Sequence, residues 1–274
     1  MSKISIREIK ERYRASKEKE RKFKWTYYVR RPISYYLAWP FLSLGISATG
    51  VTAFWLVIAI IGCSILAMGG YYNMIIGTAL LEFAVILDCV DGHIARFTRP
   101  TKTGDILDTW SGEILLVGSL FSIGIGLANS PGLISANNII PGTIDSTRIL
   151  TIGAFTAILS LSSWTTRLHW RTNALKFMPD TAKSSEPDGN IRSRKGLLII
   201  DNLFHYSGAL TMLMVIAAIF AVLDIFLIMI GLIYAVYLLT IMYKIIQTAR
   251  TLDRTGANSP NANGNVRNAI DEDD

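Results

Sequence analysis

Residues 32–81 read PISYYLAWPFLSLGISATGVTAFWLVIAIIGCSILAMGGYYNMIIGTALL and contain no Asp, Glu, Lys or Arg. Three further uncharged runs occupy residues 149–166, 202–223 and 225–243. An apolar stretch of 18 or more residues is long enough for a transmembrane helix, and a helix satisfies its own backbone hydrogen bonds inside a bilayer. These runs predict an all-α integral membrane protein and exclude a soluble enzyme, a disordered chain and a fibrous protein.

The composition agrees with this class. Apolar residues make up 51% of the 274 residues and charged residues only 18%, whereas soluble chains average about 25% charged residues. Cys63 and Cys89 both lie in apolar segments and form neither a disulfide framework nor a metal-binding spacing. The N-terminus is charged rather than apolar, so it does not resemble a secretory signal peptide.

The runs predict six transmembrane helices in one domain over residues 49–250. A cytoplasmic and interfacial segment, residues 1–48, precedes this domain, and a disordered tail, residues 251–274, follows it. Within the first segment, the aromatic-rich residues 32–48, broken by Pro40, are expected to form an amphipathic helix in the membrane interface. The predicted spans are 51–68, 74–96, 104–127, 149–164, 202–223 and 225–243, with a tight turn at Asp224 between the last two.

The distribution of positive charge decides between six and seven spans. With six spans, the N-terminus, residues 96–103, residues 167–200 and the C-terminus share one side and hold 26 of the 27 Lys and Arg residues. A seventh span at 32–48 would divide them almost evenly. Because cytoplasmic loops carry the excess of Lys and Arg, we expect six spans and cytoplasmic termini. The net charge of +6 then reflects topology and attraction to anionic lipids, and it gives no reason to invoke nucleic acid.

Carboxylates cluster at the ends of the second and third predicted spans. Asp88 and Asp91 lie one helical turn apart, and Asp105 and Asp108 repeat this relation on the next helix. The short link between the helices predicts an antiparallel hairpin that brings at least three carboxylates into one pocket at the cytoplasmic face. A charge at membrane depth costs at least about 2.5–3.5 kcal/mol, so these residues are candidates for function. Glu82, deeper in the second span, is either an interhelical hydrogen-bond partner or a functional group.

Crowded carboxylates repel one another unless a cation binds between them. Hard oxygen ligands on rigid helices suit Mg²⁺ or Mn²⁺, which take a few carboxylates together with substrate phosphate. Gly92, Ala95 and Gly104 remove side-chain bulk from the rim of the expected pocket. Arg96 offers a planar donor group suited to phosphate, or it anchors the helix at the membrane edge.

This stretch resembles the signature of the CDP-alcohol phosphotransferase (phosphatidyltransferase) family. The signature reads Asp-x2-Asp-Gly-x2-Ala-Arg, then seven to nine residues, then Gly-x3-Asp-x3-Asp. Residues 31–34 and the segment leading to Thr52 also resemble the family's surface helix and the start of its first span. The similarity covers most of residues 30–250 and is strongest over 88–108. The signature positions are occupied by Asp88, Asp91, Gly92, Ala95, Arg96, Gly104 and Asp108.

The resemblance implies a reaction and roles for these residues. An acceptor hydroxyl attacks the phosphate that bears the alcohol of a CDP-alcohol, and CMP leaves. Asp88, Asp91 and Asp108 are then metal ligands, and Asp108 is also expected to be a catalytic residue. Substrate-binding positions would be Thr52, Gly92, Ala95, Arg96 and Gly104, and Arg167, Arg171 and His205 are candidates for binding an anionic acceptor.

The sequence departs from the signature at its last position, which is Gly112 instead of Asp. In the family this carboxylate helps hold a second metal ion and is the favoured general base. Asp105, one turn from Asp108, is the expected substitute and a candidate catalytic base, whereas Glu113 is the alternative. A site with one metal ion, or a base supplied by the acceptor's own phosphate or a metal-bound water, stays open.

We therefore expect a membrane phosphotransferase of phospholipid biosynthesis. The expected donor is a CDP-linked lipid with a small polar acceptor, and the reverse arrangement, a CDP-linked small alcohol with a lipid acceptor, stays open. Two alternatives remain: a catalytically degenerate member that acts as a binding or scaffold subunit, and a divalent-cation transporter. The expected partners are the bilayer and the two substrates, and a homodimer is left open.

Overall fold

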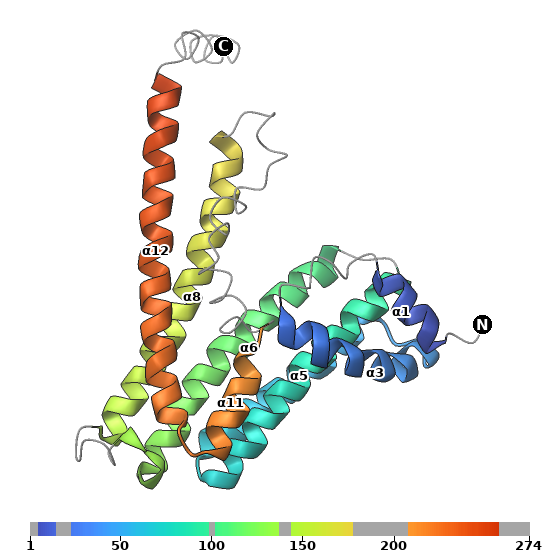
Figure 1. The fold of residues 1–274 in the computed structure, drawn as a ribbon, viewed down its shortest axis with the longest axis horizontal. Coiled ribbons are helices and arrows are strands. Elements are labelled where there is room, and N and C mark those ends of the chain that lie inside the picture. Colours follow the sequence, from blue (N-terminus) through green and yellow to red (C-terminus); the bar gives the residue numbers. More distant parts are fainter. Residues whose placement is uncertain (1–4, 15–22, 99–101, 137–143, 178–207, 258–274) are drawn as a thin grey trace, which may run out of the picture.

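The computed structural model describes residues 5–14, 23–98, 102–136, 144–177 and 208–257, and these residues form helices without any strand (Figure 1). Five of the helices are long and apolar enough to cross a membrane. They are α4 (Ala48–Met68), α5 (Tyr71–Phe97), α6 (Lys102–Ala128), α8 (Ser146–Phe177) and α12 (Leu223–Ala257). The all-helical class is thus confirmed for the described residues, and five of their helices are candidate membrane spans.

The predicted fifth span is present as a shorter apolar helix, α11 (Leu210–Ile219). The first residues predicted for this span, 202–207, lie outside the described part of the chain. The turn that follows α11 lies at 220–222, where Ala221 has a positive φ of 54°. The prediction of a turn at Asp224 is therefore wrong. Asp224 lies in the first turn of α12 and accepts a hydrogen bond from the Ala136 backbone N–H at 2.7 Å.

Two of the helices are much longer than the apolar runs that predict them. α8 continues 13 residues beyond the expected end at Trp164, and α12 continues to residue 257. At 1.5 Å per residue, the 35 residues of α12 extend over about 52 Å, whereas the hydrocarbon core of a bilayer is about 30 Å thick. Figure 1 shows both helices projecting beyond the others. The rest of the predicted tail, residues 258–274, lies outside the described residues.

Local sequence explains where the first two spans begin and end. Ser47 caps α4, because its Oγ accepts a hydrogen bond from the Gly50 N–H at 3.1 Å. Gly69 and Gly70 end the helix with φ values of 76° and 88°, a backbone conformation that side chains disfavour. The chain therefore reverses within two residues and α5 begins at Tyr71, which makes α4 and α5 an antiparallel pair.

Glycines allow the spanning helices to approach one another closely. A Cβ atom on Gly77 of α5 would lie 2.9 Å from the backbone oxygen of Gly62 on α4. Gly124 of α6 and Gly153 of α8 form a second contact of this kind. Since small residues at helix crossings are what tight packing inside a membrane requires, these pairs fix α4 against α5 and α6 against α8.

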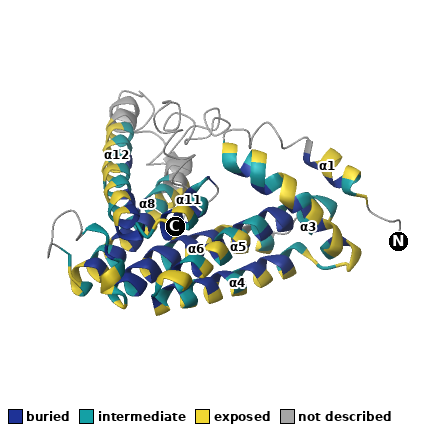
Figure 2. Ribbon diagram, turned by 60° about the horizontal axis from the view of Figure 1, so that its bottom comes forward, coloured by how far each residue is buried: buried dark blue, intermediate teal, exposed yellow. Residues whose placement is uncertain are grey.

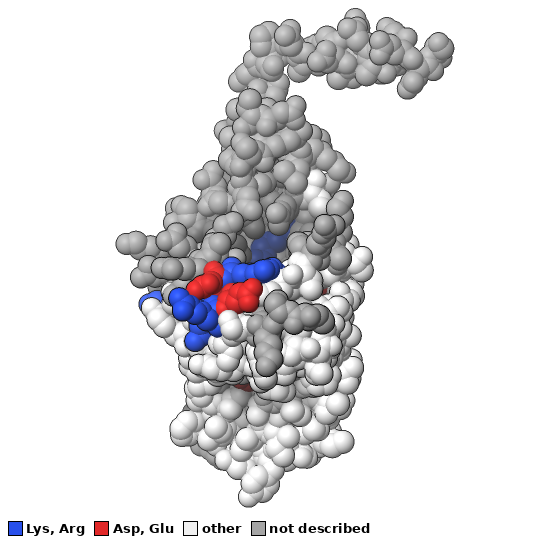
Figure 3. Space-filling model, turned by 90° about the vertical axis from the view of Figure 1, so that its right-hand side faces the viewer, with Lys and Arg blue, Asp and Glu red and all other residues white. Residues whose placement is uncertain are grey.

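The N-terminal helices pack on this bundle. α1 (Ile6–Arg14) lies against α3 (Arg31–Ser43) and α5. Its apolar face, Ile9 and Tyr13, is buried against the protein, and Pro40 lies inside α3 without ending it. Figure 2 shows alternating exposed and buried faces along these helices, and Figure 3 shows charged side chains gathered in one patch above an uncharged surface. The placement of this segment in the membrane interface stays a prediction.

A buried ion pair ties the N-terminal segment to the spans. Arg30 ends the short π-helix η1 (Thr26–Arg30), is completely buried, and donates to both carboxylate oxygens of Glu82 at 2.9 and 2.8 Å. The Trp25 indole and the Thr211 hydroxyl also donate to Glu82. Glu82 is therefore a satisfied interhelical partner, the first of the two roles that the sequence leaves open for it.

Candidate metal centre

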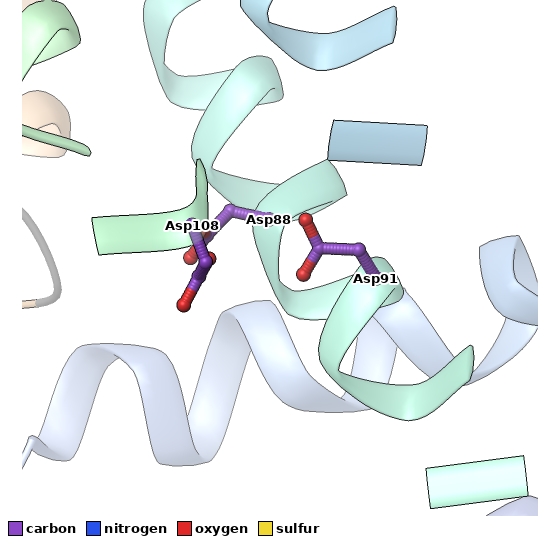
Figure 4. Close-up of side chains that lie close together, drawn as sticks. All are labelled: Asp88, Asp91 and Asp108. Atoms are coloured by element: carbon purple, nitrogen blue, oxygen red, sulfur yellow. The ribbon is translucent and has the colours of Figure 1, made fainter. Parts of the chain in front are cut away.

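Three carboxylates converge where α5, α6 and α4 meet. Asp88 and Asp91 come from α5 and Asp108 comes from α6, and one oxygen of each lies within 4.8 Å of the other two (Figure 4). Among the described residues, this is the group of acidic side chains close enough to share a metal ion. The convergence expected from the helical spacing is present.

The first spanning helix orients the most buried of the three. Asp91 is only 6% exposed, and its Oδ2 accepts hydrogen bonds from the Thr52 hydroxyl at 2.8 Å and the Trp55 indole N–H at 2.9 Å. Both donors come from α4, three residues apart and therefore on one face. They fix one oxygen of the carboxylate. Thr52 was expected among the substrate-binding residues, and in the structure it contacts Asp91.

Trp55 is a functional candidate that the sequence did not single out. Its side chain is completely buried, whereas a tryptophan in an apolar run is ordinarily interpreted as a lipid-facing or interfacial residue. The available signal was its position one turn from Thr52 on the same helical face. A buried indole N–H usually has a hydrogen-bond partner, and here that partner is the Asp91 carboxylate.

The arrangement fits a divalent cation. Asp88 Oδ1 is buried and has no hydrogen-bond partner, a costly state for a carboxylate oxygen unless a ligand satisfies it. Three closely spaced carboxylates with hard oxygen donors match the preference of Mg²⁺ or Mn²⁺. Asp88, Asp91 and Asp108 would hold the ion together.

Positive groups lie beside the carboxylates at Gly92. A Cβ atom at this position would lie 3.4 Å from Arg96 Nη1 and 3.6 Å from Arg31 Nη1. Arg96 Nη1 donates to the Gly92 carbonyl at 2.7 Å, and Arg31 Nη1 donates to the Cys89 carbonyl at 3.0 Å. The Tyr13 ring lies 5.1 Å from the Arg31 guanidinium and 5.4 Å from that of Arg96. The absence of a side chain at Gly92 thus lets two guanidinium groups lie close to the backbone of α5.

A comparison with known protein families finds a match in the region that contains these helices. Residues 45–144, 100 of the 274 residues, match the family model described as CDP-alcohol phosphatidyltransferase. This region is similar to a CDP-alcohol phosphatidyltransferase domain. It contains α4, α5 and α6, and hence all three converging carboxylates and both donors to Asp91. A search of curated proteins finds no match.

The remaining residues expected in the pocket, Ala95 and Gly104, lie on α5 and α6 within the matched region. Both are half-buried. Their predicted contact with substrate stays a prediction. Arg31 and Tyr13 lie outside the matched region, and no pattern in the sequence predicts that either lies beside Gly92.

The fourth carboxylate of the family signature has no equivalent in the described cluster. Gly112 is buried on α6, and the side chain of Asp105 lies outside the described part of the chain. Glu113 is 8% exposed and does not join the three aspartates; the charge that acts on it is Arg167 of α8. The substitution of the missing carboxylate by Asp105 or Glu113 stays a prediction.

The three acceptor candidates lie outside the matched region. Arg167 projects from α8, where its guanidinium lies 5.6 Å from the centre of the Tyr237 ring of α12, and its buried Nε has no hydrogen-bond partner. The side chain of Arg171 and all of His205 lie outside the described residues. Arg167 is therefore the candidate for which the structure gives surroundings, on the side of α6 that faces α8 and α12.

Proposed function

We propose that this chain is a membrane phosphotransferase that moves a phospho-alcohol group from a CDP-alcohol to an acceptor hydroxyl, releasing CMP, as a step of phospholipid synthesis. The observation that carries the proposal is the convergence of Asp88, Asp91 and Asp108 within the CDP-alcohol phosphatidyltransferase domain. A cation-binding triad at the end of apolar helices suits a reaction between a water-soluble diphosphate and a component of the bilayer.

In this proposal, three residues hold the cation and two further residues orient one of them. Asp88, Asp91 and Asp108 hold a divalent cation, which when bound neutralises the diphosphate and the charge that develops on the departing CMP. Thr52 and Trp55 keep Asp91 in the orientation required for this binding.

The two guanidinium groups beside Gly92 bind the donor. Arg31 and Arg96 are fixed by backbone carbonyls at 3.0 and 2.7 Å, and a guanidinium is a planar, charged donor group suited to phosphate oxygens. The absence of a side chain at Gly92 lets the nucleotide approach the backbone between them, and Ala95 and Gly104 extend this space.

Deprotonation of the acceptor hydroxyl requires a base near the cluster. We assign this role to Asp105, one turn from Asp108 on α6. Arg167, with Arg171 and His205, binds an anionic acceptor. Both assignments follow the expectations from the sequence, and they can be tested separately from the metal centre.

The decisive experiment measures CMP release by the purified protein in lipid nanodiscs. CDP-diacylglycerol and CDP-ethanolamine serve as donors, each with a panel of acceptors and with Mg²⁺ or Mn²⁺. We expect CMP release that depends on both metal and acceptor. Asp91→Asn and Asp108→Asn should each reduce it about 10³-fold or more, corresponding to a loss of about 4 kcal/mol of transition-state stabilisation.

Two results would contradict the proposal. Metal-dependent binding of the CDP-alcohol without CMP release, for every acceptor, would indicate the degenerate binding subunit that Gly112 suggests. Transport of Mn²⁺ across a vesicle membrane without any effect of CDP-alcohols would indicate a cation transporter. The exposed Asp145→Asn change, 62% exposed at the side chain and far along the chain from the aspartate cluster, is the matched control.

A further inference from the structure

The N-terminal helix α1 lies beside Arg31 and Arg96, the arginine pair at Gly92, and the function proposed above gives this helix no role. Ile9 and Tyr13, one turn apart on its apolar face, are only 1% and 2% exposed. The helix packs on α3 and on α5, at the end of the molecule where Figure 1 marks the N-terminus. Apolar contact alone would account for this packing, so the contacts of its charged and aromatic side chains decide whether α1 does more.

A charged residue of α1 binds the end of α5. Arg12 Nη1 donates to the Arg96 carbonyl oxygen at 3.2 Å, and the Arg12 guanidinium lies 4.1 Å from the centre of the Phe97 ring. A cation this close to an aromatic ring is attracted to its face. α1 is therefore fixed at the residue that supplies one member of the arginine pair, and Tyr13 is the residue directly after Arg12.

Two further rings hold the Tyr13 ring in place. Its centre lies 5.4 Å from that of His93, edge to face, and 5.7 Å from that of Tyr35. His93 is itself oriented by a hydrogen bond of 2.9 Å between its Nε2 and the Ser34 hydroxyl. Because aromatic pairs at these distances prefer particular geometries, α3 and α5 together fix the orientation of the Tyr13 ring.

The Tyr13 ring contacts both members of the arginine pair. Its centre lies 5.1 Å from the Arg31 guanidinium and 5.4 Å from that of Arg96. The Nη1 atoms of these arginines lie 3.6 and 3.4 Å from the same point, the position of a Cβ atom on Gly92. Two positive charges so close together repel each other, whereas the negative face of an aromatic ring attracts a guanidinium. The buried ring thus stabilises an arrangement that the two charges alone would oppose.

This arrangement suits the two phosphates of a diphosphate. The N–H groups of a guanidinium lie in its plane, so a guanidinium can stack on a ring and bind an oxygen at its edge. Arg31 is also near enough to the aspartate cluster for its charge to act on Asp88 and Asp91. Arg31 therefore links the aromatic contact on α1 to the aspartates that would hold the cation.

We infer that Tyr13 is a positioning residue of the donor site: its ring holds Arg31 and Arg96 side by side at Gly92, in the arrangement that binds the diphosphate of the donor. The inference rests on the proposed function, in which these two arginines bind the donor. It gives α1, which lies outside the region that matches the family model, a part in recognition of the donor.

Binding of CDP reports on the arginine pair without requiring turnover. We would titrate CDP into the whole chain in nanodiscs with saturating Mn²⁺ and, separately, Mn²⁺ without nucleotide. Tyr13→Leu keeps an apolar side chain and removes both cation–π contacts, so the Kd for CDP should rise about tenfold, about threefold for each contact. The Kd for Mn²⁺ should stay within twofold of the wild-type value, because the ring acts on the arginines and not on the carboxylates.

Two comparisons test whether Tyr13 acts through the arginines. Tyr36→Leu is the matched control, since this tyrosine of α3 is 59% exposed and its ring lies 5.4 Å from the Lys10 ammonium of α1. It should leave both Kd values unchanged. In an Arg96→Gln background, Tyr13→Leu should weaken CDP binding only about threefold, because the contact with Arg31 alone remains.

Fluorinated phenylalanines at position 13 separate the electrostatics of the ring from its shape. Tyr13→Phe keeps the ring and should bind CDP within twofold of wild type. Mono-, di- and trifluorophenylalanine at this position retain the ring and progressively weaken its negative face, so the Kd for CDP should rise stepwise with each fluorine. This series tests the inference even if Tyr13→Leu does not fold.

The outcomes separate this inference from the proposed function. CMP release by the wild type, with CDP binding unaffected by Tyr13→Leu or by fluorination, would overturn the positioning role alone. An equal loss of Mn²⁺ binding in Tyr13→Leu would also overturn it, because the whole site would then be disturbed. The expected loss of CDP binding, without CMP release from any donor, would retain the positioning role and overturn the phosphotransferase. No binding of CDP to the wild type with Mn²⁺ would overturn both.

Discussion

The hydrogen bond from Trp55 to Asp91 should control how tightly the centre binds metal. Trp55→Phe removes the indole N–H, which donates to Asp91 Oδ2 at 2.9 Å, and keeps an aromatic ring in the same buried position. The Thr52 hydroxyl, at 2.8 Å, would remain the donor to this oxygen. The carboxylate would then be less firmly oriented toward Asp88 and Asp108.

The magnitude follows from two independent considerations. A hydrogen bond to a charged group contributes about 1.5–3 kcal/mol, which corresponds to about 10- to 150-fold in an equilibrium constant. Loss of a group that orients a metal ligand typically reduces metal affinity about 10- to 100-fold. We therefore expect the Kd for Mn²⁺ to rise about 10- to 100-fold in Trp55→Phe.

The assay is isothermal titration of Mn²⁺ into the purified protein, accompanied by thermal unfolding to establish that the variant is folded. Thr52→Val removes the other donor with little change of volume and should act in the same direction, whereas Thr52→Ser keeps the hydroxyl and should bind Mn²⁺ nearly normally. Trp39→Phe, at a site 47% exposed on α3, is the tryptophan control. A folded Trp55→Phe protein whose Kd for Mn²⁺ stays within twofold of the wild-type value would refute the reasoning.

Three further predictions concern the base, the N-terminal segment and the topology. If Asp105 is the base, Asp105→Asn should reduce CMP release as strongly as loss of a metal ligand, and adding Gly112→Asp should restore part of it; normal release by Asp105→Asn would remove this residue from the mechanism. Glu82→Ala leaves Arg30 buried without its ion-pair partner and should lower the free energy of unfolding by about 3–5 kcal/mol, measured by denaturant unfolding, whereas a loss below 1 kcal/mol would contradict it. A tag within residues 133–138 should report the side of the membrane opposite to a C-terminal reporter, and labelling on the same side would contradict six spans.

Hydropathy and helical spacing were sufficient to predict the core of the site. The predicted boundaries of the first three spans agree with α4, α5 and α6 to within three residues, because Ser47, Gly69 and Gly70 supply local signals where the apolar runs begin and end. The one-turn spacing of Asp88 and Asp91, with a short link before Asp108, was enough to predict that the three carboxylates meet.

The lengths of α8 and α12 could not be predicted in the same way. Hydropathy detects the part of a helix that a bilayer can cover, and both helices continue into polar sequence after that part ends. Residues such as Thr172 on α8 and Arg250 on α12 have no apolar periodicity around them, although they are helical. Hydropathy therefore predicted the apolar part of each helix, and it did not predict how far the helix continues beyond that part.

Positive residues in the N-terminal segment have two roles, as a topological signal and as partners in contacts with α5, which the sequence alone does not distinguish. The twelve Lys and Arg residues before position 32 were interpreted together as a topological signal. In the structure, Arg30 is buried against Glu82, which is 52 residues away in the chain, and Arg31 lies beside Gly92. Such contacts depend on how α3 packs on α5, and no periodicity within a single helix predicts them.

The division of the site between matched and unmatched sequence follows from its chemistry. The three aspartates and both donors to Asp91 lie within residues 45–144, where helical spacing alone constrains which side chains can share a cation. Binding of an acceptor has no such constraint, since an anionic group can be bound by arginines from any nearby helix. Arg167 on α8, the acceptor candidate whose surroundings the structure describes, lies outside the matched segment. Acceptor identity should therefore depend on the helices around the α4–α5–α6 core, while the metal centre depends on the core itself.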